Sequence, residues 1–351
     1  MTLTPGKHPE VKITQRAPTM RQVAARAGVS VFTVSAVVNS SANVLPHTRE
    51  QVLEAMRELD YQPNHAARSL NHAKAFSVAF VSHSSGDFAD LSMGLILSGM
   101  TERLGIDGYH LVIHPVTPDL ADLRRALMTG RLDGAILAAM PAHPLLEQVS
   151  ALAYPLVFFD QPDAVQNILT VCGPYRKGIM AAVAHLAERG RKKVAFVGGP
   201  PETELAVWHN LERYAGFRVG CEAAGLTLYP ELLVHTDYSI EDARWGVRGL
   251  LECFEDSPFD AVVCASDRLA VGTIIELQAQ GKRVPEDFAV TGFDNFEYAH
   301  CTHPALTTIH FPVRDLGFQA ADLLLGRITG TLERDDVRLE LPMKLVVRSS
   351  S

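Results

Sequence analysis

Few residues in this chain have the types and spacing of a catalytic or metal-binding site. The sequence has no Walker A motif, no GxGxxG after a first strand and no GxSxG nucleophile elbow. Gly198 and Gly199 follow an apolar run, but Pro200 does not provide the helix start at which a phosphate is bound. Three histidines near Cys301 lack the spacing of zinc ligands: His300, His303 and His310. We therefore expect no enzyme activity, no metal and no cofactor.

The clearest functional pattern is MRQVAARAGVSVFTVSAVVN, at residues 20–39. It predicts two short helices joined by a turn, because Gly28 can adopt a positive φ and Ser30 can cap a second helix. Thr19 and Gln22 have the spacing of a capping box for the first helix. The second helix, at 31–38, would be the recognition helix of a helix-turn-helix, which reads base edges in the major groove. An ordinary αα-hairpin in a core is the alternative for this segment alone.

The residues that follow predict a third helix and a linker. Pro46 is a favourable first-turn residue, and the helix should run to about Tyr61. Its apolar stripe is expected at Val52, Leu53, Met56 and Leu59. We expect a flexible leader at 1–18, a helical domain at 19–62 and a hinge helix or linker at 63–75.

Charge separates this N-terminal segment from the rest of the chain. The first 75 residues carry nine Lys or Arg and five Asp or Glu. They contribute +4 to a formal net charge of −8, which leaves −12 on the remainder. A basic segment on an acidic body suits a module that meets phosphates, although chance variation could produce the same difference.

Composition and cysteine usage narrow the class of protein. With 47% hydrophobic and 21% charged residues, the chain is globular, and 351 residues predict two or three folding units. No apolar run reaches the length of a membrane span. Five scattered cysteines without a CxxC pair, and an N-terminus without an apolar signal core, predict reduced thiols in a cytoplasmic protein.

After residue 76, short apolar runs alternate with helical patterns. The expected strands are 77–81, 109–113, 134–138, 155–160, 193–198, 260–266 and 288–293. The expected helices include 120–128, 177–189, 206–224 and 268–280. Buried strands with intervening helices predict parallel α/β sheets, whose ligands bind at the carboxyl ends of the strands. There are enough strands for two sheets.

The chain resembles a known family in both parts. The pattern AGVSxxTVS at 27–35 and the pattern YxPNxxARSL at 61–70 together resemble the lactose repressor (LacI/GalR) family of bacterial transcription regulators. RLDG at 131–134, HLAERG at 185–190 and PALTTI at 304–309 extend the likeness over residues 19–349.

This resemblance implies a fold for the whole chain. It implies an all-α helix-turn-helix head and a two-lobed α/β body similar to periplasmic sugar-binding proteins, with parallel sheets and helices on both faces. The body, 76–351, would have three crossovers between its lobes and a ligand cleft between them. Lobe one is expected at about 76–160 and 293–321, and lobe two at about 161–292 and 322–351.

The resemblance also implies DNA contacts. Thr33 and Ser35 match polar positions of the recognition helix, Asn39 matches the asparagine that closes it, and Ser30 is placed for a phosphate contact. The other candidate DNA contacts are Thr19, Val31, Phe32, Ala36, Arg68, Ser69 and Leu70.

Two groups among these candidates have particular roles in the family. Arg68 and Ser69 match the hinge helix, and Leu70 matches the leucine that is wedged into the minor groove, with packing on the third helix as the alternative. The three main base-reading positions are Val31, Phe32 and Ala36. All three are apolar, so they could touch thymine methyl groups but could not read guanine with a bidentate pair.

Effector contacts follow from the same resemblance. Arg213, in the pattern RYAG, matches the arginine that grips effector hydroxyl or carboxyl groups. Asp160 ends one expected strand, Asp267 follows another, and both match polar contacts; Tyr238 matches an aromatic that packs on the ligand ring. Weaker candidates are Phe88, Phe293, His83 and Asp87. An arginine opposite carboxylates suits a polyhydroxylated ligand. Ion pairs between lobes without a ligand, or glycoside hydrolysis by paired carboxylates, are the alternatives.

The resemblance therefore implies a transcription regulator, as a repressor, that acts as a homodimer on a near-palindromic operator. Its effector would be a sugar or sugar derivative, with a purine or another small metabolite as the alternative. Whether the effector releases or promotes DNA binding stays open. The rival function is a sugar-binding protein or receptor without a DNA role, against which the intact head argues. The chain lacks a leucine-heptad tail, which favours a dimer over a tetramer.

Overall fold

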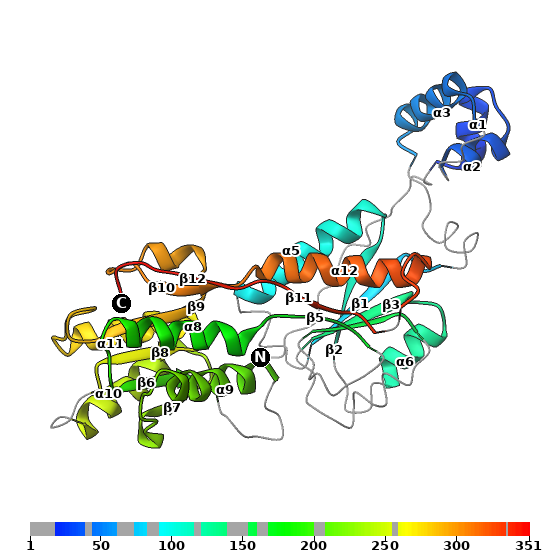
Figure 1. Ribbon diagram of the computed structural model, residues 1–351. Coiled ribbons are helices and arrows are strands. Elements are labelled where there is room, and N and C mark those ends of the chain that lie inside the picture. The colour runs from blue at the N-terminus through cyan, green and yellow to red at the C-terminus, as the bar shows by residue number, and fades with distance from the viewer. Residues whose placement is uncertain are drawn as a thin grey trace, which may run out of the picture. The chain divides into compact units, whose positions relative to one another are not determined.

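The computed structural model describes residues 18–38, 44–61, 74–82, 91–115, 121–138, 154–159, 168–199, 208–254, 259–334 and 336–351. The chain forms two compact units, residues 1–74 and 75–351, which are treated separately below (Figure 1). No helix within the described ranges is long and apolar enough to cross a membrane.

The described residues of the first unit form three helices: α1 (Met20–Ala27), α2 (Val31–Val38) and α3 (Pro46–Glu58). The capping residues predicted at the ends of α1 and at the start of α2 are confirmed. Thr19 and Gln22 form both hydrogen bonds of a capping box, and Gly28 ends α1 with a φ of 66°. The hydroxyl of Ser30 accepts the Thr33 N–H at 3.0 Å, which caps α2.

The core of this unit is small and apolar. Its fully buried members include Val23, Val34 and Val52, one from each helix. Leu53 was expected in the buried stripe of α3, and that expectation was wrong: its side chain is 44% exposed. Ala55 is buried instead, because positions 52, 55, 56 and 59 share one face of a helix and position 53 lies about 100° away from it.

In the second unit, the described residues form two six-stranded sheets. The first sheet has the order β11-β5-β4-β3-β1-β2, and the second has the order β12-β10-β9-β8-β6-β7. The strands of the first sheet are β1 (Ser77–Ser82), β2 (His110–Pro115), β3 (Gly134–Ala138), β4 (Leu156–Phe159), β5 (Leu169–Cys172) and β11 (Arg338–Glu340). Those of the second are β6 (Val194–Gly198), β7 (Leu233–His235), β8 (Ala261–Cys264), β9 (Ala289–Asp294), β10 (Thr307–His310) and β12 (Lys344–Val346). All pairings are parallel except that of β10 with β12. The predicted α/β class is confirmed.

Helices connect these strands. They are α5 (Leu91–Ile106), α6 (Ala121–Met128), α8 (Tyr175–Glu188), α9 (Trp208–Ala223), α10 (Ile240–Cys253), α11 (Asp267–Ala279) and α12 (Val313–Thr329). Two 3-10 helices, η2 (Pro230–Leu232) and η3 (Glu297–His300), complete the described elements. In the second sheet's lobe, α8 packs against α9 and α10 packs against α11.

Both faces of the first sheet are buried. Val78 and Phe80 of β1 belong to the core cluster that α5 and α12 also join, whereas Ala79 and Val81 face the cluster of α6. Alternate residues of a strand point to opposite faces, so this apolar run needs helices on both sides.

The strand pairing corrects the expected lobe limits. β5 pairs with β4, so lobe one extends to Cys172 and does not end near residue 160. β10 pairs in parallel register with β9, so residues 293–310 belong to lobe two, although they were expected in lobe one. A strand hydrogen-bonded along its length must stay in the sheet of its neighbour, and the chain changes lobe only after it ends. We define lobe one as the first sheet with α5, α6 and α12, and lobe two as the second sheet with α8 to α11.

Followed from one described strand to the next, the chain passes between the lobes at three points. These crossings follow β5, β10 and β11. After β10 the chain enters α12, which packs on α5 and against β3, β4 and β5 of lobe one. β11 then joins the first sheet and β12 returns to the second.

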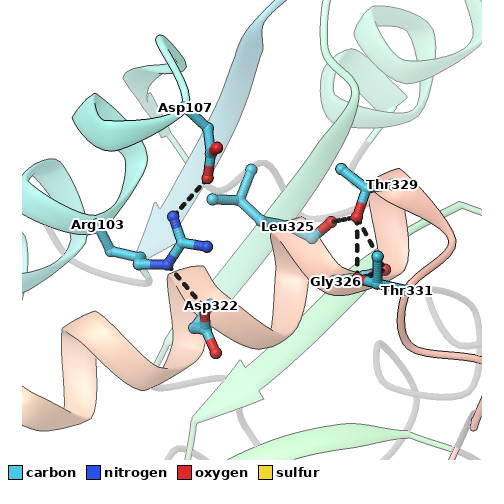
Figure 2. Close-up of polar contacts among 7 residues, drawn as sticks. All are labelled: Arg103, Asp107, Asp322, Leu325, Gly326, Thr329 and Thr331. Atoms are coloured by element: carbon cyan, nitrogen blue, oxygen red, sulfur yellow. Dashed lines mark hydrogen bonds and ion pairs between the residues drawn. The ribbon is translucent and has the colours of Figure 1, made fainter.

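Helices α5 and α12 lie side by side in close contact (Figure 1). A Cβ on Gly99 would lie 2.0 Å from the carbonyl oxygen of Arg314, and one on Gly317 would lie 2.0 Å from that of Ile96. Figure 2 shows Arg103 of α5 between two carboxylates, with Nη1 2.5 Å from Asp107 and Nε 2.6 Å from Asp322 of α12. Farther along α12, the Thr329 hydroxyl donates to the Leu325 carbonyl (Figure 2). The pair is therefore fixed by backbone contact and by an ion pair between the helices.

Candidate functional site

Helix α2 presents an apolar surface. Val31 is 42% exposed and Phe32 is 83% exposed, while Val34 and Val37 of the same helix are buried in the core. Exposed phenylalanine at the first turn of a short helix has no role in the packing of this unit. The surface is therefore available to a partner, and its contacts would be apolar.

Hydroxyl groups at the start of α2 are already engaged with one another. Ser30 Oγ and Thr33 Oγ1 lie 2.9 Å apart, and Ser30 Oγ also accepts the Thr33 N–H. Thr33, Ser35 and Ala36 are half-buried. Four other expected DNA contacts, Asn39, Arg68, Ser69 and Leu70, lie outside the described residues.

In the second unit, a polar cluster surrounds Arg213 of α9. The guanidinium carbon lies 4.4 Å from the ring centre of Phe293 and 5.0 Å from that of Tyr175, so both aromatic rings pack on this charged group. Arg213 Nη2 is 3.6 Å from Asp294 Oδ1 at the end of β9. Burial disfavours the charge of Arg213, but nearby Tyr238, Asp294 and Tyr175 outweigh it and raise the pKa above its ordinary value.

Arg213 has unused hydrogen-bonding capacity. Its side chain is 9% exposed, and its Nε has no hydrogen-bond partner among the residues that the structure describes. A buried donor without a partner costs free energy, so this atom is a place where a ligand hydroxyl or carboxyl oxygen would gain a bond.

Tyr238 and two residues of α9 complete the cluster. The Tyr238 hydroxyl donates to Asn210 Oδ1 at 2.6 Å, and burial raises the pKa of Tyr238. A Cβ on Gly199 would lie 2.8 Å from the Tyr238 ring, so only glycine lets that ring pack at the end of β6. Burial, with a smaller effect from Arg213, lowers the pKa of His209 to about 3. His209 is therefore neutral at physiological pH and can both donate and accept.

Asp267 follows β8, as expected, and its carboxylate is bonded within lobe two. It begins α11, is fully buried, and its carboxylate accepts the Phe296 N–H at 2.8 Å and the Thr308 hydroxyl at 2.5 Å. Burial raises the pKa of Asp267 to about 7. The carboxylate therefore faces the interior of lobe two, and Asp294 is the carboxylate that lies beside Arg213.

Several expected effector contacts are not placed by the structure. Asp160, Phe88, His83 and Asp87 lie outside the described residues. Phe293 is described, and it is fully buried against Arg213 and Tyr175 instead of lining an open wall.

Four residues of this cluster were missed in the sequence: Tyr175, His209, Asn210 and Asp294. Asp294 had a usable signal, because it ends an apolar strand, as Asp160 was expected to do. The other three are on helices, where only the folded structure brings them to Arg213.

A cavity of about 430 Å³ adjoins the cluster at Asp294. It is lined mainly by apolar and aromatic side chains, among them Leu91 of lobe one and Phe296 and Tyr298 of lobe two. This size and lining are typical of small-molecule sites. The cluster itself combines a fixed guanidinium, a carboxylate, a neutral imidazole and an amide at the carboxyl end of a parallel sheet, which suits an uncharged polyhydroxylated ligand.

Comparison with known proteins covers both units. Residues 19–64 match the model of the bacterial regulatory proteins of the lacI family, and residues 183–351 match the periplasmic binding protein-like domain. The HTH-type transcriptional regulator CelR of Thermobifida fusca is 33% identical over 343 residues, which cover 96% of this chain and 99% of CelR. The ribose operon repressor of Halalkalibacterium halodurans is 30% identical over 338 residues, 95% of this chain and 97% of the relative.

Solved structures show the same likeness. The complex of the regulator CelR with cellobiose has a TM-score of 0.70 at 31% identity and matches 95% of this chain and 100% of that one. The Lac repressor dimer bound to operator and to the anti-inducer ONPF has a TM-score of 0.79 at 27% identity, over 95% of this chain and 99% of that one. Both likenesses span the helical unit and the two-sheet unit together.

Proposed function

Because the chain belongs to the lacI family of bacterial regulatory proteins, we propose that it is a transcriptional repressor whose operator affinity is controlled by a small sugar. Helix α2 enters the major groove of operator DNA, and the sugar binds between the two lobes of residues 75–351. The relatives that match over nearly the full length are named regulators and repressors, which supports a regulator over an enzyme. A regulator of this kind works where the DNA is, so we place it in the cytoplasm.

The DNA-binding surface consists of α2 and the residues around it. The proposed contacts are Thr19, Ser30, Val31, Phe32, Thr33, Ser35, Ala36 and Asn39, with Arg68, Ser69 and Leu70 at the operator centre. A homodimer would place two such surfaces on a near-palindromic operator, as two-fold symmetry of protein and DNA requires. The Lac repressor structure, a dimer on its operator, supports this arrangement.

The observation that carries the sugar proposal is the pairing of Arg213 with Asp294. A sugar hydroxyl between these groups can accept from the guanidinium, including its unpartnered Nε, and donate to the carboxylate. Because the two charges offset one another, an uncharged sugar fits better than an acid. The remaining proposed contacts are Tyr238, His209, Phe293, Asp160, Asp267, Phe88, His83 and Asp87. The relative CelR has been solved with cellobiose, which makes cellobiose the first probe.

The test begins with a thermal-shift screen of cellobiose, ribose and other neutral sugars, sugar acids and purines, because a ligand of the folded state raises the melting temperature. Arg213→Met should lose the shift of the sugar that stabilises the wild type. Arg218→Met, an exposed arginine on the same helix, is the matched control and should keep it.

Gel shifts then test the DNA role, with the wild type and DNA from upstream of its own gene. We expect binding that the stabilising sugar weakens or strengthens. A protein that binds the sugar but no DNA at low salt would be the rival sugar-binding protein. Full sugar affinity in Arg213→Met would refute the site.

A further inference from the structure

The three chain segments that cross between the lobes meet at one point. Gly173 lies in the crossing after β5, Phe311 in the crossing after β10 and Met343 in the crossing after β11. A Cβ on Gly173 would lie 2.4 Å from Met343 Cε and 2.9 Å from Phe311 Cε2, so both side chains pack directly on the backbone of the glycine. Such close packing allows only a few discrete arrangements. A change in the orientation of the lobes must therefore change the contacts at this point.

Tyr175 connects this point to the proposed effector site. It is the first residue of α8, directly after the crossing that holds Gly173, and it is 3% exposed. The ring centres of Tyr175 and Phe311 are 5.3 Å apart, and the two rings meet edge to face at 69°. The guanidinium carbon of Arg213 lies 5.0 Å from the same Tyr175 ring centre. One ring therefore contacts both the proposed effector arginine and the crossing that leads into α12 of lobe one.

The end of β9 supports this contact. Phe293 stacks on Tyr175 with ring centres 5.9 Å apart, and its own ring centre is 4.4 Å from the guanidinium carbon of Arg213. The backbone carbonyl of Asp294 accepts the Phe311 N–H at 3.4 Å, while the Asp294 carboxylate lies 3.6 Å from Arg213 Nη2. The two groups that would hold a sugar hydroxyl are thus packed against, or bonded to, the residues that position Phe311.

We propose that the contact between Tyr175 and Phe311 couples sugar binding to the arrangement of the lobes. Arg213 and Tyr175 belong to lobe two, whereas Phe311 lies on the chain that enters lobe one. A sugar that fixes the guanidinium fixes the ring that packs on it, and this ring favours one position of the crossing. Operator binding, which also favours one arrangement of the lobes, acts on the same contact in the reverse direction. This inference rests on the proposed function, because it concerns the regulation of the same site.

Four substitutions separate this coupling from packing in general. Tyr175→Leu and Phe311→Leu each keep an apolar side chain but remove the edge-to-face ring contact. Tyr175→Phe keeps the ring and is the conservative variant. Phe259→Leu is the matched control, because Phe259 and Phe288 also form an edge-to-face pair, with ring centres 4.9 Å apart, but both precede strands of lobe two.

Calorimetry with cellobiose measures the coupling. The measured quantity is the ratio of the dissociation constants of cellobiose for the operator-saturated protein and for the free protein. A loss of affinity that both states share cancels in this ratio, so a residue that only stabilises the fold or the site leaves the ratio unchanged.

We expect Tyr175→Leu and Phe311→Leu each to bring this ratio about threefold or more closer to one, and the double variant to go no further, because both remove the same contact. Tyr175→Phe and Phe259→Leu should keep the wild-type ratio. An unchanged ratio in Tyr175→Leu, or an equal loss in Phe259→Leu, would overturn the proposal.

A second measurement needs no ligand. Amide hydrogen exchange reports on the hydrogen bond from Phe311 to Asp294 and on that from the Val313 N–H to the Phe311 carbonyl, which is 2.8 Å long. We expect both amides to exchange about fivefold or more faster in Tyr175→Leu, and at the wild-type rate in Tyr175→Phe and Phe259→Leu. Thermal unfolding serves as a check that each variant is folded.

Unchanged exchange of Phe311 and Val313 in folded Tyr175→Leu would also overturn the proposal. Failure of the wild type to bind cellobiose, or a wild-type ratio of one, counts against the proposed function instead. In that case the exchange measurement still decides whether Tyr175 holds the crossing into lobe one.

Discussion

Phe32 is the most informative single residue of the helical unit, because its side chain is 83% exposed on the helix proposed to read DNA. With Val31 and Ala36 it makes a base-reading surface that offers methyl and ring contacts and few hydrogen bonds. The thymine methyl group is the one apolar feature of a base edge in the major groove. We therefore expect the operator to be read through thymines.

Replacement of thymine by deoxyuridine removes only that methyl group. At the positions opposite α2, we expect each replacement to weaken wild-type binding about fourfold, since a buried methyl group contributes about 0.8 kcal/mol. Phe32→Ala should weaken binding to the thymine operator and lose this sensitivity, while Leu53→Ala, an exposed leucine on α3, should not. Fluorescence anisotropy on selected operators measures both. A strict guanine requirement opposite α2 would contradict the account.

The raised pKa of Asp267 leads to a separate prediction about how stability depends on pH. Burial raises its pKa in the folded protein to about 7, well above the ordinary value near 4 that applies to the unfolded chain. The folded state therefore binds this proton more tightly, and the stabilisation present below pH 4 is lost as the pH rises through 7. Arg348 and the hydrogen bonds from Thr308 and Phe296 oppose this shift without reversing it.

Asp267→Asn cannot titrate, so the free energy of unfolding of the wild type relative to this variant should fall as the pH rises from 4 to 8. Urea unfolding at several pH values measures the difference. Parallel pH profiles for the wild type and Asp267→Asn would show that the buried carboxyl does not titrate in this range.

At the scale of elements, the close packing of α5 against α12 depends on two glycines. Added methyl groups at Gly99 or Gly317 would meet backbone carbonyl oxygens, which cannot move aside as a flexible side chain can. Gly99→Ala should therefore destabilise the protein by about 1–3 kcal/mol in urea unfolding. Gly105→Ala, on the same helix with open space around it, should be neutral or stabilising. Equal stability of the two variants would mean that the helices do not pack as described.

The elements with strong local patterns could be predicted from the sequence, and those defined by pairing could not. β3 matches its predicted range of 134–138, since it is a continuous apolar run that ends in turn signals. β11 and β12 were missed, because each has only three residues and no more than partly buried side chains. Their place in a sheet depends on pairing with distant strands, which no local pattern records.

The same distinction applies to the candidate site: some of its features could be predicted from the sequence, and others depend on distant contacts. Arg213 and Tyr238 were expected in the site, and the structure brings them together with Asp294. The inward position of Asp267 could not be foreseen, because its partners Phe296 and Thr308 are 29 and 41 residues away in sequence. A carboxylate at the end of a strand can face a ligand or the interior, and only these distant partners decide which.

At the scale of the whole molecule, the function requires that sugar binding in one unit changes DNA binding by another. The proposed site lies at the carboxyl end of the sheet of lobe two, and Asn295, which follows Asp294, is hydrogen-bonded to His310 and Arg348, which lie next to two lobe crossings. Sugar binding there would favour one arrangement of the lobes, and operator binding would favour one as well. Such coupling is reciprocal by necessity.

The most direct test is therefore the affinity of the stabilising sugar for the free protein and for the protein saturated with its operator, measured by calorimetry. We predict that the two dissociation constants differ about fivefold or more, and that operator affinity changes by the same factor when sugar is added. Arg213→Met should bind the operator as the wild type does in the absence of sugar, and should not respond to the sugar. Equal sugar affinities with and without the operator would contradict the claim that this protein is a sugar-controlled repressor.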